Sequence, residues 1–188
     1  MDFSYQIDDE IKLTLLTERD AEDFYRVVRE NLEQLKIWLP WADDNYSIES
    51  VKRFVWQNFA EYTQSKGFSA VINYRGKIAG EIGFHDVNLT CKSTQVNYWL
   101  AIEAQGRGVM TKSCRALVNH AFKNMGLNRI EIDCQIENRK SRAVPERLGF
   151  ELEGVRRQSA WLHNRFIDLA QYALISQDWK KQLLVEDE

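Results

Sequence analysis

The chain has 188 residues, a formal net charge of −3, 44% hydrophobic residues and 12% aromatic residues. This length and apolar content suffice to bury one core, so we expect a single domain over residues 1–188, with its core at about 11–176. Acidic and basic residues are interleaved along the chain, which argues against the basic surface that direct nucleic-acid binding requires.

The cysteines and the N-terminus indicate a reducing compartment. Cys91, Cys114 and Cys134 are far apart and form no C-x-x-C pair, so neither a disulfide framework nor a metal site is expected. The N-terminus lacks the basic and apolar regions of a secretion signal, and no apolar run approaches the length of a membrane span. We therefore expect a cytoplasmic protein without a membrane partner.

The first third of the chain predicts one strand and two helices. Residues 11–15 alternate like a strand, and a capping box at residues 17–20 predicts a helix that ends before Pro40. The stretch KIWLPWADD around this proline is too broken for regular structure. Ser47 then caps a second predicted helix, whose apolar face includes Phe59 and which Gly67 ends.

The remaining elements favour a sheet with helices on it. Two strands joined by a tight turn at residues 75–76 make an antiparallel hairpin, and a further strand leads into a glycine loop. A helix with one apolar stripe follows and is ended by Gly126. The last predicted elements are a strand at 130–136, a short helix at 141–148 and strands at 150–158 and 166–176. The order predicts an α/β (α+β) fold with a β-rich core, an antiparallel hairpin and about four helices.

The glycine loop is the first candidate site. Gly106 and Gly108 flank Arg107 between a predicted strand and a predicted helix, where free backbone N–H groups and the helix N-terminus can hold an anion. The alternative is a tight turn without a ligand. Thr111 stands where a Walker loop or a Rossmann turn would need glycine, so neither nucleotide motif fits.

Three motifs together resemble a known family. Residues 105–110, QGRGVM, resemble the Q/R-x-x-G-x-G/A pyrophosphate loop of GNAT acetyltransferases, although Met110 replaces a small residue. Asn138 to Ser141 with LGFELEG at 148–154, and WLPW at 38–41, are similar to segments of the Rim ribosomal-protein N-terminal (serine/alanine) acetyltransferases. The resemblance covers about residues 11–176 and implies the GNAT acyl-CoA N-acyltransferase fold, whose central sheet is mixed and mostly antiparallel.

The resemblance also implies which residues bind acetyl-CoA. Loop N–H groups would hold the pyrophosphate with Arg107 adding charge, and the preceding strand would splay from its neighbour and leave backbone groups free for pantetheine. Asn138 would contact CoA, and Ser141 would lie beside the sulfur; the alternative for both is helix capping. The predicted set is Leu100, Ala101, Ile102, Gln105, Gly106, Arg107, Gly108, Val109, Met110, Thr111, Asn138 and Ser141.

Pro145 adds a geometric expectation. If a helix runs through Ser141, proline at position 145 cannot donate to the Ser141 carbonyl, which is then free to take another partner.

The catalytic base is less well marked. Many relatives carry glutamate where this chain has Gln95 and Ala160. Glu81 and His85 share a strand face and are the candidate bases. The alternatives are a solvent-exposed strand face for Glu81 and a surface position at a strand end for His85. A peptide α-amine, with a pKa near 7.7 to 8.0, needs a strong base less than lysine, near 10.4.

These features predict an acetyl-CoA-dependent N-acetyltransferase for a protein N-terminal α-amine, such as that of a ribosomal protein. Trp38, Trp41 and Asp43 are the candidate acceptor-binding residues, with core packing and a solvated loop as alternatives. Two other functions stay open: acetylation of a small amine (polyamine, amino acid or antibiotic), and sensing of acetyl-CoA without turnover. Whether two subunits pair as a homodimer is also open.

Overall fold

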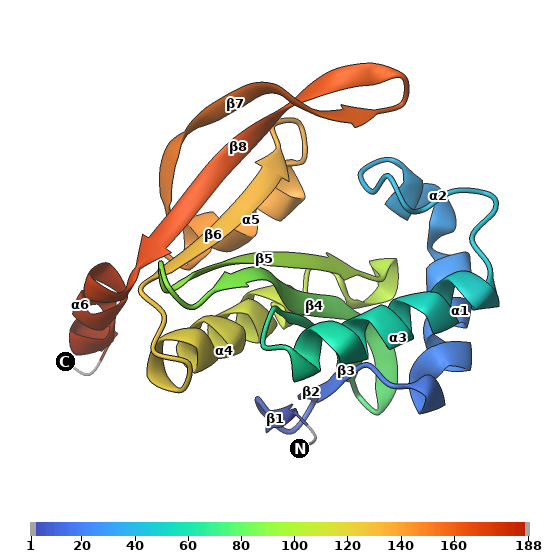
Figure 1. Cartoon of the computed structure of the whole chain (residues 1–188), viewed down its shortest axis with the longest axis horizontal. Coiled ribbons are helices and arrows are strands. Elements are labelled where there is room, and N and C mark those ends of the chain that lie inside the picture. Colours follow the sequence, from blue (N-terminus) through green and yellow to red (C-terminus); the bar gives the residue numbers. More distant parts are fainter. Residues whose placement is uncertain (1–2, 187–188) are drawn as a thin grey trace.

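The computed structural model describes residues 3–186, so Met1 and Asp2 of the N-terminal segment lie outside it. Its centre is one eight-stranded sheet with the order β1-β2-β3-β4-β5-β6-β8-β7 (Figure 1). The strands are β1 (Ser4–Gln6), β2 (Ile11–Leu15), β3 (Phe68–Tyr74), β4 (Lys77–Asn88), β5 (Ser93–Leu100), β6 (Arg129–Gln135), β7 (Glu151–Leu162) and β8 (Arg165–Ile175).

Six α-helices and two short 3-10 turns connect the strands of the described chain. They are η1 (Glu18–Asp20), α1 (Ala21–Glu30), α2 (Leu32–Lys36), α3 (Ile48–Thr63), η2 (Ile102–Ala104), α4 (Val109–Lys123), α5 (Arg139–Arg147) and α6 (Ser176–Glu186). From the sequence we expected about four helices. The break between α1 and α2 and the C-terminal helix α6 were not predicted. No helix within residues 3–186 is long and apolar enough to cross a membrane.

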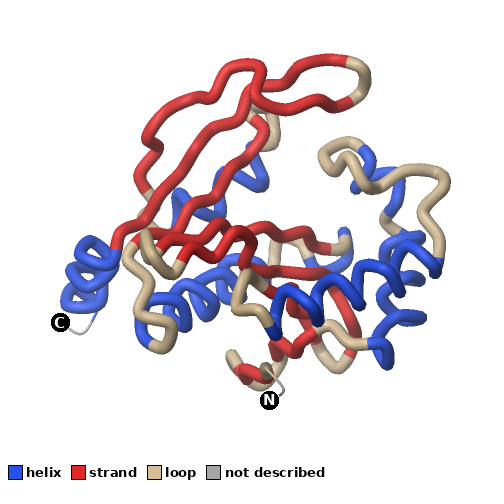
Figure 2. Tube along the Cα trace, viewed as in Figure 1, coloured by secondary structure: helices blue, strands red, loops and turns tan. Residues whose placement is uncertain are grey.

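The sheet opens between its fifth and sixth strands. In residues 3–186 the one parallel pair joins β5 to β6, and it covers only Ser93–Gln95 against Arg129–Glu131. Beyond Gln95 the two strands diverge, and β6 continues along β8 instead. Figure 2 shows β6, β8 and β7 rising away from β4 and β5. We call the space between the diverging strands the β5–β6 gap.

Two apolar layers cover the sheet. Alternate residues of β2 to β6 pack with α4 and α5 on one face, in a core that contains Leu117, Ile130 and Ile132. On the other face α1, α2 and α3 form a second core that includes Val71 and Trp99 of the sheet. The strand alternation therefore gives β5 one face toward α4 and one toward α1 to α3.

Several local predictions are confirmed. Arg75 and Gly76 have φ values of 53° and 77°, which fits the two left-handed residues of a type I′ hairpin turn. The Ser47 hydroxyl accepts from the N–H of Ser50 at the start of α3. Buried and half-buried residues alternate along β6, as its sequence predicts.

Three details of the predicted helices are wrong. Helix α3 ends at Thr63, four residues before Gly67, and α4 ends at Lys123 rather than directly before Gly126. Phe59 is 60% exposed instead of buried. The neighbouring Asn58 takes the buried position: its amide donates to the carbonyls of Leu16 and Ser69, and its oxygen accepts from the Ser69 N–H.

Candidate active site

The glycine loop forms a bare turn in front of α4. Gly106 and Gly108 have φ values of 72° and 75°, a left-handed conformation that residues with a Cβ rarely adopt. A Cβ built on either would meet no atom within 4 Å, so conformation rather than crowding requires glycine here. Gly108 is the N-cap of α4, whose first N–H groups have no partner within the helix. The loop thus presents open backbone donors at a helix N-terminus.

The side chains of this loop hold it in place. Gln105 donates to the Leu100 carbonyl over 3.0 Å and accepts from Lys140 of α5 over 3.2 Å. Arg107 is exposed and donates to the Glu103 carbonyl over 3.1 Å. Val109 and Met110, the first residues of α4, are buried, and Thr111 is half-buried, so what these three residues offer outward is mainly their backbone.

The backbone groups available to pantetheine are not all those predicted from the sequence. The N–H of Ala101 donates to Ala79 and the N–H of Ile102 to the Asn31 side chain, so neither group is free as expected. In an antiparallel strand, alternate residues bond to the same neighbour. Because Ala101 bonds to β4, Tyr98 and Leu100 direct their backbone groups toward the β5–β6 gap. Of the predicted residues, Leu100 alone keeps the expected edge position.

Ser141 lies on the α5 side of the gap, in contact with two residues that the sequence did not single out. Its Oγ is 3.2 Å from the Cys134 Sγ, and the Tyr98 hydroxyl donates to its carbonyl over 2.9 Å. This carbonyl is the one that Pro145 cannot bond, so the expectation of another partner is confirmed. Asn138 caps α5 by accepting from the Ser141 N–H over 3.0 Å, which is the alternative given for it.

Burial keeps the groups around Ser141 protonated. It raises the pKa of Tyr98 well above the usual range, and the charges of Cys134 and Cys114 act in the same direction. It also raises the pKa of Cys134, against the smaller opposing effect of the Ser141 and Tyr98 hydroxyls. The cluster therefore offers hydroxyl and thiol donors rather than anions at neutral pH.

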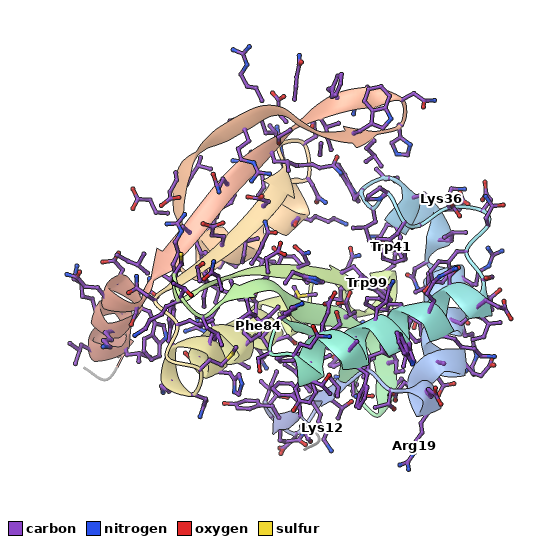
Figure 3. All side chains as sticks on the ribbon, in the orientation of Figure 1. Lys12, Arg19, Lys36, Trp41, Phe84 and Trp99 are labelled. Carbon is purple, nitrogen blue, oxygen red and sulfur yellow. The ribbon has the colours of Figure 1, made fainter. Side chains whose placement is uncertain are left out.

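Glu81 lies on the opposite face of the sheet, among aromatic residues. It is 8% exposed, which overturns the solvated alternative, and it pairs across the strands with Val71 and Trp99. Burial raises its pKa to about 7, partly offset by Ser69 and Trp99. In the described part of the chain the Trp99 indole N–H has no hydrogen-bond partner. Trp99 therefore lowers the pKa of Glu81 by its proximity rather than by a formed hydrogen bond. Trp41 packs on Trp99 with ring centroids 6.3 Å apart (Figure 3).

His85 is separated from Glu81 along the strand. It is half-buried and pairs across β4 and β5 with Gln95. Burial lowers its pKa, while Glu61 and Asp86 oppose this effect. Gln95 donates to Asp133 of β6 over 2.9 Å, and Ala160 lies on β7 near its hairpin end. Gln95 is thus a hydrogen-bonded amide, and Ala160 is an alanine on the outer hairpin, so neither side chain can act as a base.

The predicted acceptor residues form two groups. The Trp38 carbonyl accepts from Gln135 of β6 over 2.8 Å, which ties the end of α2 to the wall of the gap. Asp43 lines a cavity of about 320 Å³ between the segment after α2 and the tip of the β7–β8 hairpin, where Trp161 and His163 face it. Trp41 is 41% exposed and does not line this cavity.

The structure thus brings the loop at 105–110, Leu100, Asn138 and Ser141 together around the gap, and leaves Glu81, His85 and Asp43 apart on the other face. The sequence analysis missed Tyr98 and Cys134, which contact Ser141. The strand alternation that places Tyr98 on the same edge as Leu100 could have identified Tyr98, whereas its contact with Ser141 depends on tertiary packing.

No cluster of His, Cys, Asp or Glu within residues 3–186 could hold a metal ion.

Known proteins match this arrangement. A family model described as the acetyltransferase (GNAT) domain matches residues 10–151. A putative ribosomal N-acetyltransferase of Bacillus subtilis, YdaF, is 32% identical over 95% of this chain and 98% of its own length. The ribosomal-protein-serine acetyltransferase of Escherichia coli is 26% identical over 90% of this chain and 95% of its own.

A comparison with solved structures indicates the same family. The structure of RimL, a ribosomal-protein α-N acetyltransferase bound to coenzyme A through a disulfide to a cysteine, has a TM-score of 0.89 and 26% identity. The match covers 92% of this chain and 98% of RimL. With a glycine loop at a helix N-terminus, diverging strands beside it and these matches, the chain belongs to the GNAT family of acetyltransferases.

Proposed function

We propose that the protein transfers the acetyl group of acetyl-CoA to the N-terminal α-amine of a protein, of the ribosomal-protein type. The observation that carries the proposal is the β5–β6 gap, which has the glycine loop at one end and Ser141 on its side. Relatives named as ribosomal-protein serine and alanine acetyltransferases, 26% and 24% identical, support the acceptor class.

The gap supplies each function that acetyl transfer needs. The N–H groups of residues 106–110 and the start of α4 would hold the pyrophosphate, where the open space above both glycines leaves room. The outward backbone groups of Tyr98 and the N–H of Leu100 would pair with the pantetheine amides, because the Leu100 carbonyl already accepts from Gln105. Ser141, kept in place by its contacts with Tyr98 and Cys134, would donate a hydrogen bond to the departing sulfur.

The acceptor would enter from the other face of the sheet. The cavity lined by Asp43 and Trp161, at the tip of the hairpin, would accommodate residues that follow the N-terminus. An α-amine suits this site because a useful fraction is neutral at pH 7. We place the reaction in the cytoplasm, with acetyl-CoA and the acceptor as the two substrates, without a metal, nucleic acid or membrane, and with a homodimer as a possible assembly.

Calorimetry and thiol release test the proposal together. The protein is expected to bind CoA and to release thiol with short peptides that begin with Ser or Ala, more than with polyamines or lysine side chains. Ser141→Ala should lower kcat about 100-fold and change CoA affinity less than twofold, while Ser159→Ala on β7 changes neither. Equal losses of kcat and affinity would make Ser141 a binding residue. Thermal protection by acetyl-CoA with no thiol release from any amine would favour the sensor.

A further inference from the structure

Asp133 on β6 has a buried carboxylate with one oxygen unused. Its side chain is only 9% exposed. Gln95 donates to Oδ2 over 2.9 Å and Arg156 approaches the same oxygen at 3.2 Å, whereas Oδ1 has no hydrogen-bond partner among the residues described. A buried carboxylate oxygen without a donor is costly, so it indicates a partner that arrives from outside.

Asp133 lies in the wall of the β5–β6 gap. The last β6 residue that pairs with β5 is Glu131, and Asp133 is the next residue on the same strand face. Its neighbour Cys134 points to the opposite face, where it contacts Ser141. Cys134 and Ser141 thus lie on one face of β6. Asp133 lies on the other face, which it shares with Gln95 and from which the acceptor would enter in the proposed function.

We infer that Asp133 is the group that binds the acceptor amine and takes its proton. The inference rests on the proposed acetyl transfer and names the catalytic residue for it. Gln95 has a positioning function, because it holds Oδ2 and leaves Oδ1 for the amine.

The two bases expected from the sequence are less well placed. Glu81 is on β4, with all of β5 between it and the gap, and the paired side chains of Val71 and Trp99 enclose it. His85 is also on β4 and reaches the gap only through Gln95. Asp133 is therefore the buried carboxylate that borders the gap directly.

The surroundings of Asp133 make its carboxylate a stronger proton acceptor than an exposed one, because they raise its pKa. Burial raises its pKa, and Glu131 acts in the same direction. Arg156 and Gln95 oppose this rise and keep an ionised form accessible. The remaining neighbour across the ladder is Gln171 of β8, which is neutral.

The proton and electron balance is complete without another reactant. The amine nitrogen forms a bond to the thioester carbonyl carbon, and its proton passes to Oδ1 of Asp133. The carbon–sulfur bond then breaks, and the thiolate accepts a hydrogen bond from Ser141 and takes a proton from water. Asp133 returns its proton to water, so the products are the amide and free CoA thiol.

The test compares Asp133→Asn with Glu131→Gln, its neighbour on the same face of β6. With a peptide that begins with Ser, Asp133→Asn should lower kcat at least 100-fold, with the melting temperature and CoA affinity near those of the wild type. Glu131→Gln should keep kcat within about threefold. Retention of more than a tenth of kcat by Asp133→Asn would overturn the assignment of Asp133 while leaving acetyl transfer intact.

The pH profile separates catalysis from structure. In the wild type, log kcat should fall on the acid side as Asp133 becomes protonated. Arg156→Gln removes the cation that lowers the pKa of Asp133, so this acid limb should move to higher pH. A limb that does not move would contradict the assignment. A wild type that binds CoA but acetylates no amine would overturn the proposed function, and the assignment with it.

Discussion

Replacement of Glu81 by glutamine should stabilise the protein at alkaline pH. The carboxyl group is 8% exposed, and burial raises its pKa from 4.5 to about 7. Each tenfold change in proton affinity corresponds to about 1.4 kcal/mol, so ionised Glu81 destabilises the folded state by about 3 kcal/mol. Between the two pKa values the folded state binds more protons than the unfolded state. Stability therefore falls as pH rises from 4.5 to 7 and stays low above it.

Glutamine has nearly the same shape and does not ionise, so the Glu81→Gln variant avoids this loss. At pH 8 its free energy of unfolding should exceed that of the wild type by about 3 kcal/mol, or its melting temperature by roughly 6 to 12 °C. At pH 5 the difference should shrink below about 1 kcal/mol. Urea unfolding at both pH values measures this, with Glu151→Gln on exposed β7 as the control. A variant no more stable than the wild type at pH 8, or a difference that does not narrow at pH 5, would refute the reasoning.

Three further substitutions test other parts of the molecule. Gly108→Ala places a Cβ on a residue at φ 75°, which should lower the free energy of unfolding by about 1 to 2 kcal/mol. Thermal unfolding measures this loss, and calorimetry should show weaker CoA binding. Gly154→Ala is the control, because the φ of Gly154 is not positive. Asn58→Leu leaves buried backbone groups without partners and should lower the unfolding free energy by about 3 kcal/mol or more, measured in urea. Trp161→Ala opens the cavity at the hairpin tip and should raise KM for the acceptor peptide severalfold with unchanged CoA affinity; an unchanged KM would exclude this cavity from acceptor binding.

Features that depend on neighbours in the sequence could be predicted well. The turn at residues 75–76, the Ser47 cap and the alternation of β6 each follow from a few adjacent residues. The glycine loop belongs to this class. A backbone with left-handed φ values favours glycine, so the glycines at 106 and 108 mark such a loop in the sequence. The fold class followed from the order of these elements together with the family motifs.

Features that depend on tertiary pairing could not be predicted. Which N–H groups near Leu100 stay free depends on Ala79 and Asn31, which are distant in the sequence. The burial of Glu81 depends on helices packing over its strand, which overturned the expectation of a solvated face. Asp133 looked like one polar residue in an alternating strand, and only the divergence of β5 and β6 distinguishes it from Glu131.

The single short parallel pairing has a consequence for how the protein is made. Each of the strands from β2 to β5 pairs with the strand before it in the chain, so the five strands β1 to β5 can assemble on a nascent chain while the rest is still being translated. The other wall of the gap is encoded later, from residue 129 onward. Once the chain up to Gly126 has emerged from the ribosome, one wall and the glycine loop can be in place before Ser141 has emerged, so the site is completed only in a late stage of synthesis.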